Sequence, residues 1–138
     1  MALAFEEKQS HVDDWSLIFV YGSLKRGFAL HRCLSQQVFV ATASTQPHYR
    51  LFDCGTYPAM VKVAVGGRSV KGELFRVDQQ CLFKLDEAEG VGEGLYVREA
   101  VSLCSPFETV RAIAWFFLPP TKGLLDCGSE WPATERPG

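Results

Sequence analysis

Short runs of β-branched and aromatic residues, broken repeatedly by glycine and proline, constrain this chain more than any other feature. Runs of this kind are typical of β-strands. They cover residues 15–21, 38–43, 49–52, 58–65, 69–77, 95–103 and 109–118. Only residues 79–89 read as a substantial helix, because Asp78 can cap its start and Gly90 can end it. The pattern predicts an α+β fold, a small mixed, mostly antiparallel β-barrel with flanking helices.

The boundaries of the domain follow from the same pattern. Residues 1–14 and 130–138 are polar and aperiodic, so we expect flexible tails on either side of one domain at residues 15–129. A chain of 138 residues with 47% hydrophobic content can bury one core. Within the domain, Gly66-Gly67 can supply positive φ angles, which predicts a tight hairpin between residues 58–65 and 69–77.

Charge and cysteine content exclude several classes of partner. A net charge of -2 argues against a nucleic-acid binder, which would carry a surplus of Lys and Arg. No apolar run has the length of a secretory signal or a membrane span. The five cysteines are odd in number and contain no C-x-x-C pair, which favours free thiols in a reducing compartment. We therefore expect a cytoplasmic protein, away from membranes and nucleic acids, that acts as a monomer on a small molecule.

Glu89 is the first candidate for chemistry. On a helix over residues 79–89 it lies four residues after Leu85 and seven after Leu82, on the apolar stripe. Desolvation and the negative end of the helix dipole would both raise its pKa toward a value useful for proton transfer. The alternative is a solvated residue in a fraying last turn, like Asp86 and Glu87, and the pattern alone leaves both open.

The loop at residues 22–27 is the second candidate. A strand that ends in Gly-Ser exposes backbone N–H groups that can converge on an anion or a carbonyl oxygen. The loop has the spacing of a phosphate-binding loop, but Phe28-Ala29 stands where Lys and Ser/Thr are required, which argues against a nucleotide site. Lys25 and Arg26 could bind an anion or could simply be solvated.

Two other groups carry weaker signals. His31 and Cys33 are close in sequence, which does not imply a hydrogen bond, and we do not expect covalent catalysis by the thiol. Trp115, Phe116 and Phe117 could line a ligand pocket, but an aromatic run in a strand is more typical of core packing.

Several motifs together make the chain recognisable. They occur in the order Phe19-Val20-Tyr21-Gly22-Ser23-Leu24-Lys25-Arg26-Gly27 with His31, Gly55-Thr56-Tyr57-Pro58-Ala59, Val70-Lys71-Gly72-Glu73-Leu74-Phe75, Leu85-Asp86-Glu87-Ala88-Glu89-Gly90 and Leu95-Tyr96-Val97-Arg98. This combination resembles the γ-glutamylcyclotransferase superfamily, and within it the γ-glutamylamine cyclotransferase or AIG2-like branch. The resemblance spans residues 18–117.

The resemblance implies a specific reaction and a set of roles. A γ-glutamyl group would be cyclised to 5-oxoproline with release of the free amine, and neither a metal nor a cofactor is needed. Glu89 would be the catalytic acid/base. Tyr21, Gly22, Ser23 and Leu24 would hold the substrate. Tyr96 and Arg98 share one face of their strand and could both enter the pocket.

Two questions stay open at this stage. Leu30 stands where relatives in this branch often carry Asn, so the substrate could be a γ-glutamyl amine, a γ-glutamyl amino acid, glutathione or a γ-glutamyl biosynthetic intermediate. The chain could also be a non-catalytic ligand-binding or regulatory module on the same fold.

Overall fold

The computed structural model describes residues 15–132. The predicted tail at 1–14 and residues 133–138 of the predicted tail at 130–138 lie outside this range, whereas Trp131 of that second tail is buried. Its elements in chain order are β1 (Ser16–Val20), η1 (His31–Leu34), β2 (Val38–Ser44), β3 (Tyr49–Asp53), β4 (Pro58–Lys62), β5 (Lys71–Val77), α2 (Gln79–Ala88), η2 (Val91–Glu93), β6 (Tyr96–Val101), β7 (Ala112–Phe117) and β8 (Leu125–Asp126). The predicted strands and the predicted helix are confirmed to within a few residues. The two-residue strand β8 was not predicted, because it is too short to show a period.

The larger sheet has five strands in the order β2-β5-β1-β7-β6. Strand β1 lies at its centre, antiparallel to β5 and parallel to β7, and the remaining pairs are antiparallel. The predicted α+β class and mostly antiparallel pairing are therefore confirmed. The predicted barrel is wrong: closure requires the two edge strands to pair, and the edge strands β2 and β6 are joined only by an isolated bridge between Thr45 and Leu103, just past their ends.

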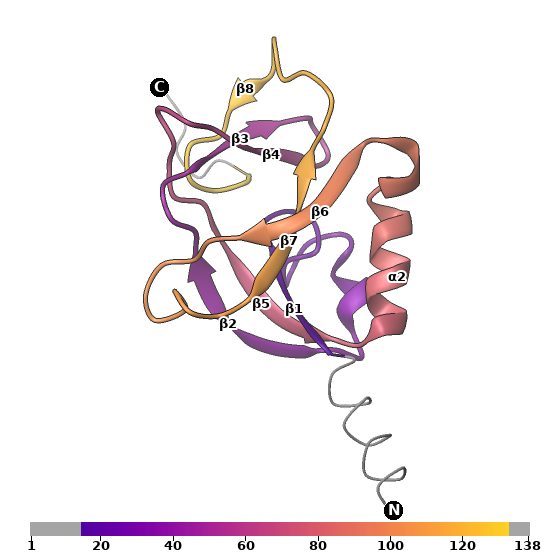
Figure 1. Ribbon diagram of the computed structural model, residues 1–138. Helices are drawn as coiled ribbons and strands as arrows, with labels where there is room; N and C mark the ends of the chain where they lie inside the picture. Colours follow the sequence, from indigo (N-terminus) through magenta and orange to yellow (C-terminus); the bar gives the residue numbers. More distant parts are fainter. Residues whose placement is uncertain (1–14, 133–138) are drawn as a thin grey trace, which may run out of the picture.

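A second sheet explains why the first does not close. Strands β4, β3 and β8 form it in that order, so they are not available to complete a barrel. The predicted hairpin between β4 and β5 is wrong for the same reason: β4 pairs with β3, and β5 pairs with β1 and β2. Gly66 does adopt a positive φ of 73°, but the chain at this turn crosses from one sheet to the other. Figure 1 shows the small sheet above the large one, with α2 alongside.

Alternating residues of β1 separate two cores. Phe19 faces the core between the two sheets, with Leu51 and Met60 from the smaller sheet. Ile18 and Val20 face the core between the large sheet and α2. All five side chains are at most 3% exposed. The end of β1 is therefore fixed on both faces, which holds the loop that follows it.

Helix α2 has the predicted caps. The Asp78 side chain accepts a hydrogen bond of 2.8 Å from the backbone N–H of Cys81, and Gly90 adopts a left-handed conformation with φ 70°. Leu82 and Leu85 are buried against the sheet. No helix in the described residues is long and apolar enough to cross a membrane.

Candidate active site

A narrow pocket lies where the loop after β1 meets the end of α2 and strand β6. Its cavity volume is about 30 Å³. Six predicted site residues line it: Tyr21, Gly22, Ser23, Leu24, Glu89 and Tyr96. The fold thus brings together residues that the sequence predicts from three separate motifs.

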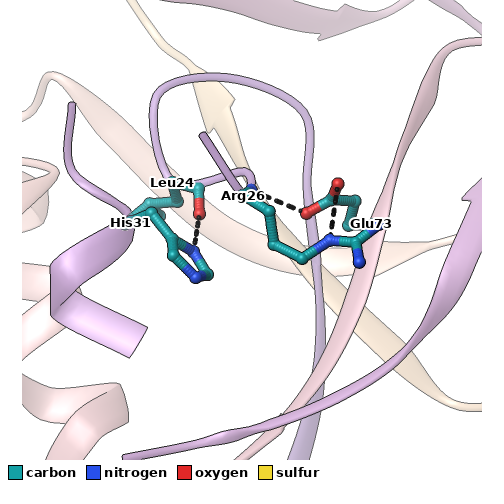
Figure 2. Close-up of polar contacts among 4 residues, drawn as sticks. All are labelled: Leu24, Arg26, His31 and Glu73. Atoms are coloured by element: carbon teal, nitrogen blue, oxygen red, sulfur yellow. Dashed lines mark hydrogen bonds and ion pairs between the residues drawn. The ribbon is translucent and has the colours of Figure 1, made fainter. Parts of the chain in front are cut away.

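The loop after β1 is anchored from its outer side. The Glu73 carboxylate of β5 accepts a 2.9 Å hydrogen bond from the Arg26 backbone N–H and a 3.3 Å bond from Arg26 Nε. The His31 ring nitrogen Nδ1 lies 3.1 Å from the Leu24 carbonyl oxygen. Figure 2 shows both contacts at the same short loop. Arg26 and His31 therefore hold the loop from outside, and neither lines the pocket.

The inner side of the loop carries unused donors. The backbone N–H groups of Gly22, Ser23 and Leu24 donate to no acceptor within residues 15–132. Gly22 and Leu24 are buried. Buried N–H groups without a partner are rare in native proteins. Three consecutive free N–H groups along a pocket wall, two of them on buried residues, are suited to bind a carboxylate or a polarised carbonyl oxygen.

Glu89 lines the same pocket from the end of α2. It is the last residue of the helical spiral, and its backbone N–H donates to the Leu85 carbonyl at 2.9 Å before Gly90 turns the chain away. Its side chain is partly buried and lines the pocket, so the alternative of a freely solvated residue does not hold. Burial, and then the nearby Asp86 carboxylate, raise the pKa of Glu89 to about 7. The contribution of Asp86 was not predicted from the sequence.

Two buried tyrosines form part of the walls. The Tyr21 hydroxyl donates to the Trp115 carbonyl, and the Tyr96 hydroxyl donates to the Pro58 carbonyl. Burial raises the pKa of both phenols, so both are neutral at physiological pH. Each hydroxyl joins the pocket wall to a neighbouring strand, and its oxygen still has a lone pair that can accept from a ligand.

Sequence reasoning missed five lining residues: Tyr57, Pro58, Trp115, Phe19 and Val20. The first two lie in the quoted motif Gly55-Thr56-Tyr57-Pro58-Ala59, but no role was drawn from it. Trp115 was predicted as core, and at 2% exposure it is core as well as pocket wall. Strand β4 reaches the pocket only because it belongs to a separate sheet, which no local pattern indicated.

Arg98 is the one predicted site residue that does not line the pocket. Its Nη1 donates to Asp86 Oδ2 at 2.8 Å. Tyr96 and Arg98 both belong to β6, as predicted, but only Tyr96 lines the pocket, and the Arg98 side chain turns toward α2. Arg98 contacts the helix that carries Glu89 and not the pocket.

A larger cavity of about 590 Å³ lies elsewhere, between the edge of the large sheet and residues 104–107 and 130. Lys25 and Glu73 line it, but Glu89 and the tyrosines of the narrow pocket do not. The buried Lys25 ammonium donates to the Trp131 carbonyl at 2.7 Å, which gives it a structural partner. The narrow pocket is the better candidate because the free N–H groups and the perturbed carboxyl meet there. Within residues 15–132, no cluster of three His, Cys, Asp or Glu side chains is arranged to hold a metal ion.

The pocket combines a carboxylate that can accept a proton with backbone N–H groups that can donate hydrogen bonds to a substrate oxygen. A carboxyl group with a pKa near 7 can take and return a proton close to neutral pH. The free N–H groups in the same pocket can hold a carboxylate or stabilise charge on a carbonyl oxygen. This arrangement suits acyl transfer in which the substrate supplies its own nucleophile.

Comparisons with known proteins agree on one family. The family model for "Gamma-glutamyl cyclotransferase, AIG2-like" matches residues 18–133. A Vibrio cholerae protein whose name places it among the gamma-glutamylcyclotransferases is 36% identical over 102 residues, covering 74% of this chain and 80% of that one. Human gamma-glutamylaminecyclotransferase is 37% identical over 81 residues, covering 54% of this chain and 53% of its own length. The crystal structure of a mouse AIG2-like protein superposes with a TM-score of 0.66 at 25% identity, covering 88% of this chain and 99% of that one.

Proposed function

Because this chain belongs to the gamma-glutamyl cyclotransferase, AIG2-like family, we propose that it cyclises the γ-glutamyl group of a small γ-glutamyl compound to 5-oxoproline. The substrate would be a γ-glutamyl amine or a γ-glutamyl amino acid, and the second product is the free amine. The observation that carries the proposal is that the Glu89 carboxyl, with its raised pKa, lines the same pocket as residues 22–24, whose backbone N–H groups are free.

In the proposed reaction the substrate's α-amine attacks its own γ-carbonyl carbon. A new C–N bond closes the five-membered lactam, and the original amide C–N bond breaks. Glu89 takes a proton from the attacking amine and delivers it to the departing nitrogen, so no water is consumed. The attack is intramolecular, and a pocket that holds the chain folded lowers the entropic part of the barrier.

The remaining groups would bind and orient the substrate. The N–H groups of Gly22, Ser23 and Leu24 would hold the α-carboxylate or polarise the γ-carbonyl oxygen. The Tyr21 and Tyr96 phenols stay neutral, so they would fix the pocket walls without competing for the proton that Glu89 moves.

The test is release of 5-oxoproline by purified protein from γ-glutamyl-ε-lysine, γ-glutamyl-alanine and glutathione. Glu89→Gln keeps the shape of the side chain but cannot accept a proton, so we expect its rate to fall about 10²–10⁴-fold. Glu87→Gln, which changes an exposed carboxylate two residues away, is the matched control and should keep the wild-type rate. Because Glu89 must be ionised to act as the base, the wild-type rate should rise with pH through a midpoint near 7.

Each outcome leads to a different conclusion. The compound with the highest rate names the substrate class. A wild-type protein that binds γ-glutamyl compounds without converting them would overturn the cyclotransferase proposal in favour of the binding module. If Glu89→Gln is as active as the wild type, the role proposed for Glu89 is wrong.

A further inference from the structure

Asp86 fastens the end of the helix that carries Glu89 to two strands at once. It precedes Glu89 by three residues, about one helical turn. Its Oδ2 accepts from Arg98 Nη1 at 2.8 Å, and its Oδ1 accepts from Trp115 Nε1 at 2.9 Å. Arg98 on β6 and Trp115 on β7 are directly opposite each other in the strand pairing, so their side chains leave the same face of the sheet. We call Asp86, Arg98 and Trp115 the Asp86 clamp.

The clamp continues into the pocket wall. Trp115 is 2% exposed, lines the pocket, and accepts a hydrogen bond from the Tyr21 hydroxyl through its carbonyl oxygen. Tyr96 stands two residues from Arg98 on the same strand and lines the pocket as well. Both donors to Asp86 therefore belong to strands that build the walls around Glu89. A shift of the last turn of α2 would break contacts with β6 and β7 together.

The clamp also determines the charge near Glu89. The charged and titratable groups on the elements that build this region are of two kinds. The charged ones are Asp86 and Glu87 on α2, Glu93 on η2 and Arg98 on β6. The phenols and the thiol are Tyr96 on β6, Tyr21 after β1, and Cys54 and Tyr57 between β3 and β4. Burial raises the pKa of Tyr21, Tyr96 and Cys54, so these groups are neutral at neutral pH. Glu87 and Glu93 are exposed to solvent, which screens them. The Asp86 carboxylate is the charge that acts most directly on Glu89, and Arg98 is its ion-pair partner.

We propose that Asp86 is a positioning residue for Glu89, held by Arg98 and Trp115, and that Arg98 acts on the reaction through Asp86 without touching the substrate. The proposal rests on the proposed function, because Glu89 is taken as the proton-transfer group. It assigns a reason to the partly buried pairing of two charged side chains beside the pocket, which is not needed to cap the helix.

Two substitutions in the clamp should have opposite effects on the pH dependence. Asp86→Asn can still accept the Trp115 N–H through its amide oxygen, but it removes the negative charge and leaves Arg98 unpaired. The midpoint of the rise in rate should therefore move to lower pH, by about 0.5–1 unit. Arg98→Gln leaves the Asp86 charge uncompensated, so the midpoint should move to higher pH by a similar amount.

Matched variants separate the effect of charge on the pH midpoint from any effect of the substitution on folding. Arg98→Lys keeps a cation, so its midpoint should stay closer to the wild-type value than that of Arg98→Gln. Glu87→Gln removes a charge on the exposed side of the same helix turn and should leave the midpoint in place. Because neither Asp86 nor Arg98 touches the substrate, kcat should fall, by about tenfold, while KM changes little. Circular dichroism would identify any variant that fails to fold.

A readout independent of activity separates this proposal from the proposed function. The Glu89 carboxyl can be titrated by NMR in protein labelled with ¹³C-glutamate, with Glu89→Gln assigning the signal, and the Trp115 indole N–H should shift in Asp86→Asn. If the protein releases no 5-oxoproline, the proposed function fails while the titration still tests the clamp. If the Glu89 titration is unchanged in both variants, or moves in the same direction in both, the clamp proposal is wrong.

Discussion

At the scale of single residues, Glu89 combines a favourable position for chemistry with an unfavourable one for stability. Burial raises its pKa from 4.5 to about 7, so the folded protein holds this proton more tightly than the unfolded chain does. Stability that is fully present below about pH 4.5 is therefore lost as the pH rises through about 7. A base that is useful near neutral pH destabilises the fold in the same pH range.

Glu89→Gln should accordingly stabilise the protein at pH 8 and have little effect at pH 5. The full shift corresponds to about 3 kcal/mol, and partial exposure of the carboxyl reduces the expected gain to on the order of 1–2 kcal/mol. Urea denaturation at the two pH values measures the difference. Glu87→Gln is the control, because its exposed carboxylate should not produce a pH-dependent change. Equal effects of Glu89→Gln at both pH values would contradict the raised pKa.

Glu89 and Asp86 show how much of the site can be predicted from residue patterns. The spacing from Leu82 and Leu85 correctly predicted that Glu89 faces inward, because the helical period fixes the face of a residue from its neighbours. The partner of Arg98 could not be predicted in this way. Asp86 meets Arg98 only after α2 packs on the sheet, and that contact depends on strand order and not on local sequence.

At the scale of elements, the loop after β1 depends on close packing against the start of β4. A Cβ atom at Gly22 would lie 2.6 Å from two atoms of the Pro58 ring. The carbonyl of the same Pro58 accepts the Tyr96 hydroxyl. Glycine at this position lets the loop approach β4 closely enough for the pocket wall to form.

Gly22→Ala should therefore displace the loop and weaken substrate binding or turnover, and should cost about 1–3 kcal/mol of stability through overpacking. Gly92→Ala is the matched control, because nothing lies within 4 Å of its added Cβ and its φ is not positive. Thermal denaturation and the 5-oxoproline assay measure the two effects. The packing argument is wrong if the two alanine variants behave alike.

The elements themselves were predicted better than their pairing. Periodicity located β1, β5 and α2 because each signal is local. The pairing of β4 with β3, and not with β5, depends on a choice between partners of similar composition. Gly67 illustrates why glycines alone do not establish a hairpin. A Cβ atom at this position would lie 2.4 Å from the Pro47 carbonyl oxygen, so glycine is needed here because another backbone segment packs closely against it. The barrel was predicted wrongly because strand counts do not say how strands divide between sheets.

At the scale of the whole molecule, the segment around Trp131 holds distant parts of the chain together. Sequence reasoning placed residue 131 in a polar tail, yet its side chain is 7% exposed and belongs to the core between the two sheets. Its indole Nε1 donates to Asp53 Oδ1 at 3.1 Å, and its ring packs at 5.9 Å from that of Phe28. Its carbonyl accepts the buried Lys25 ammonium of the candidate substrate loop. One residue thus joins the small sheet to the loop that builds the pocket.

Trp131→Ala should therefore cost about 3–5 kcal/mol, the range for removal of a buried tryptophan. Trp15→Ala is the matched control, because that tryptophan is 42% exposed and its loss should cost no more than about 0.5 kcal/mol. Urea denaturation compares the two variants. The Trp131→Ala variant keeps the backbone carbonyl that accepts from Lys25. If the variant is folded but binds substrate more weakly than the wild type, the packing of the residue 131 side chain positions Lys25 and the loop that carries it. If Trp131→Ala costs no more than Trp15→Ala, the chain beyond residue 129 is a tail, as its composition suggested, and the core ends before it.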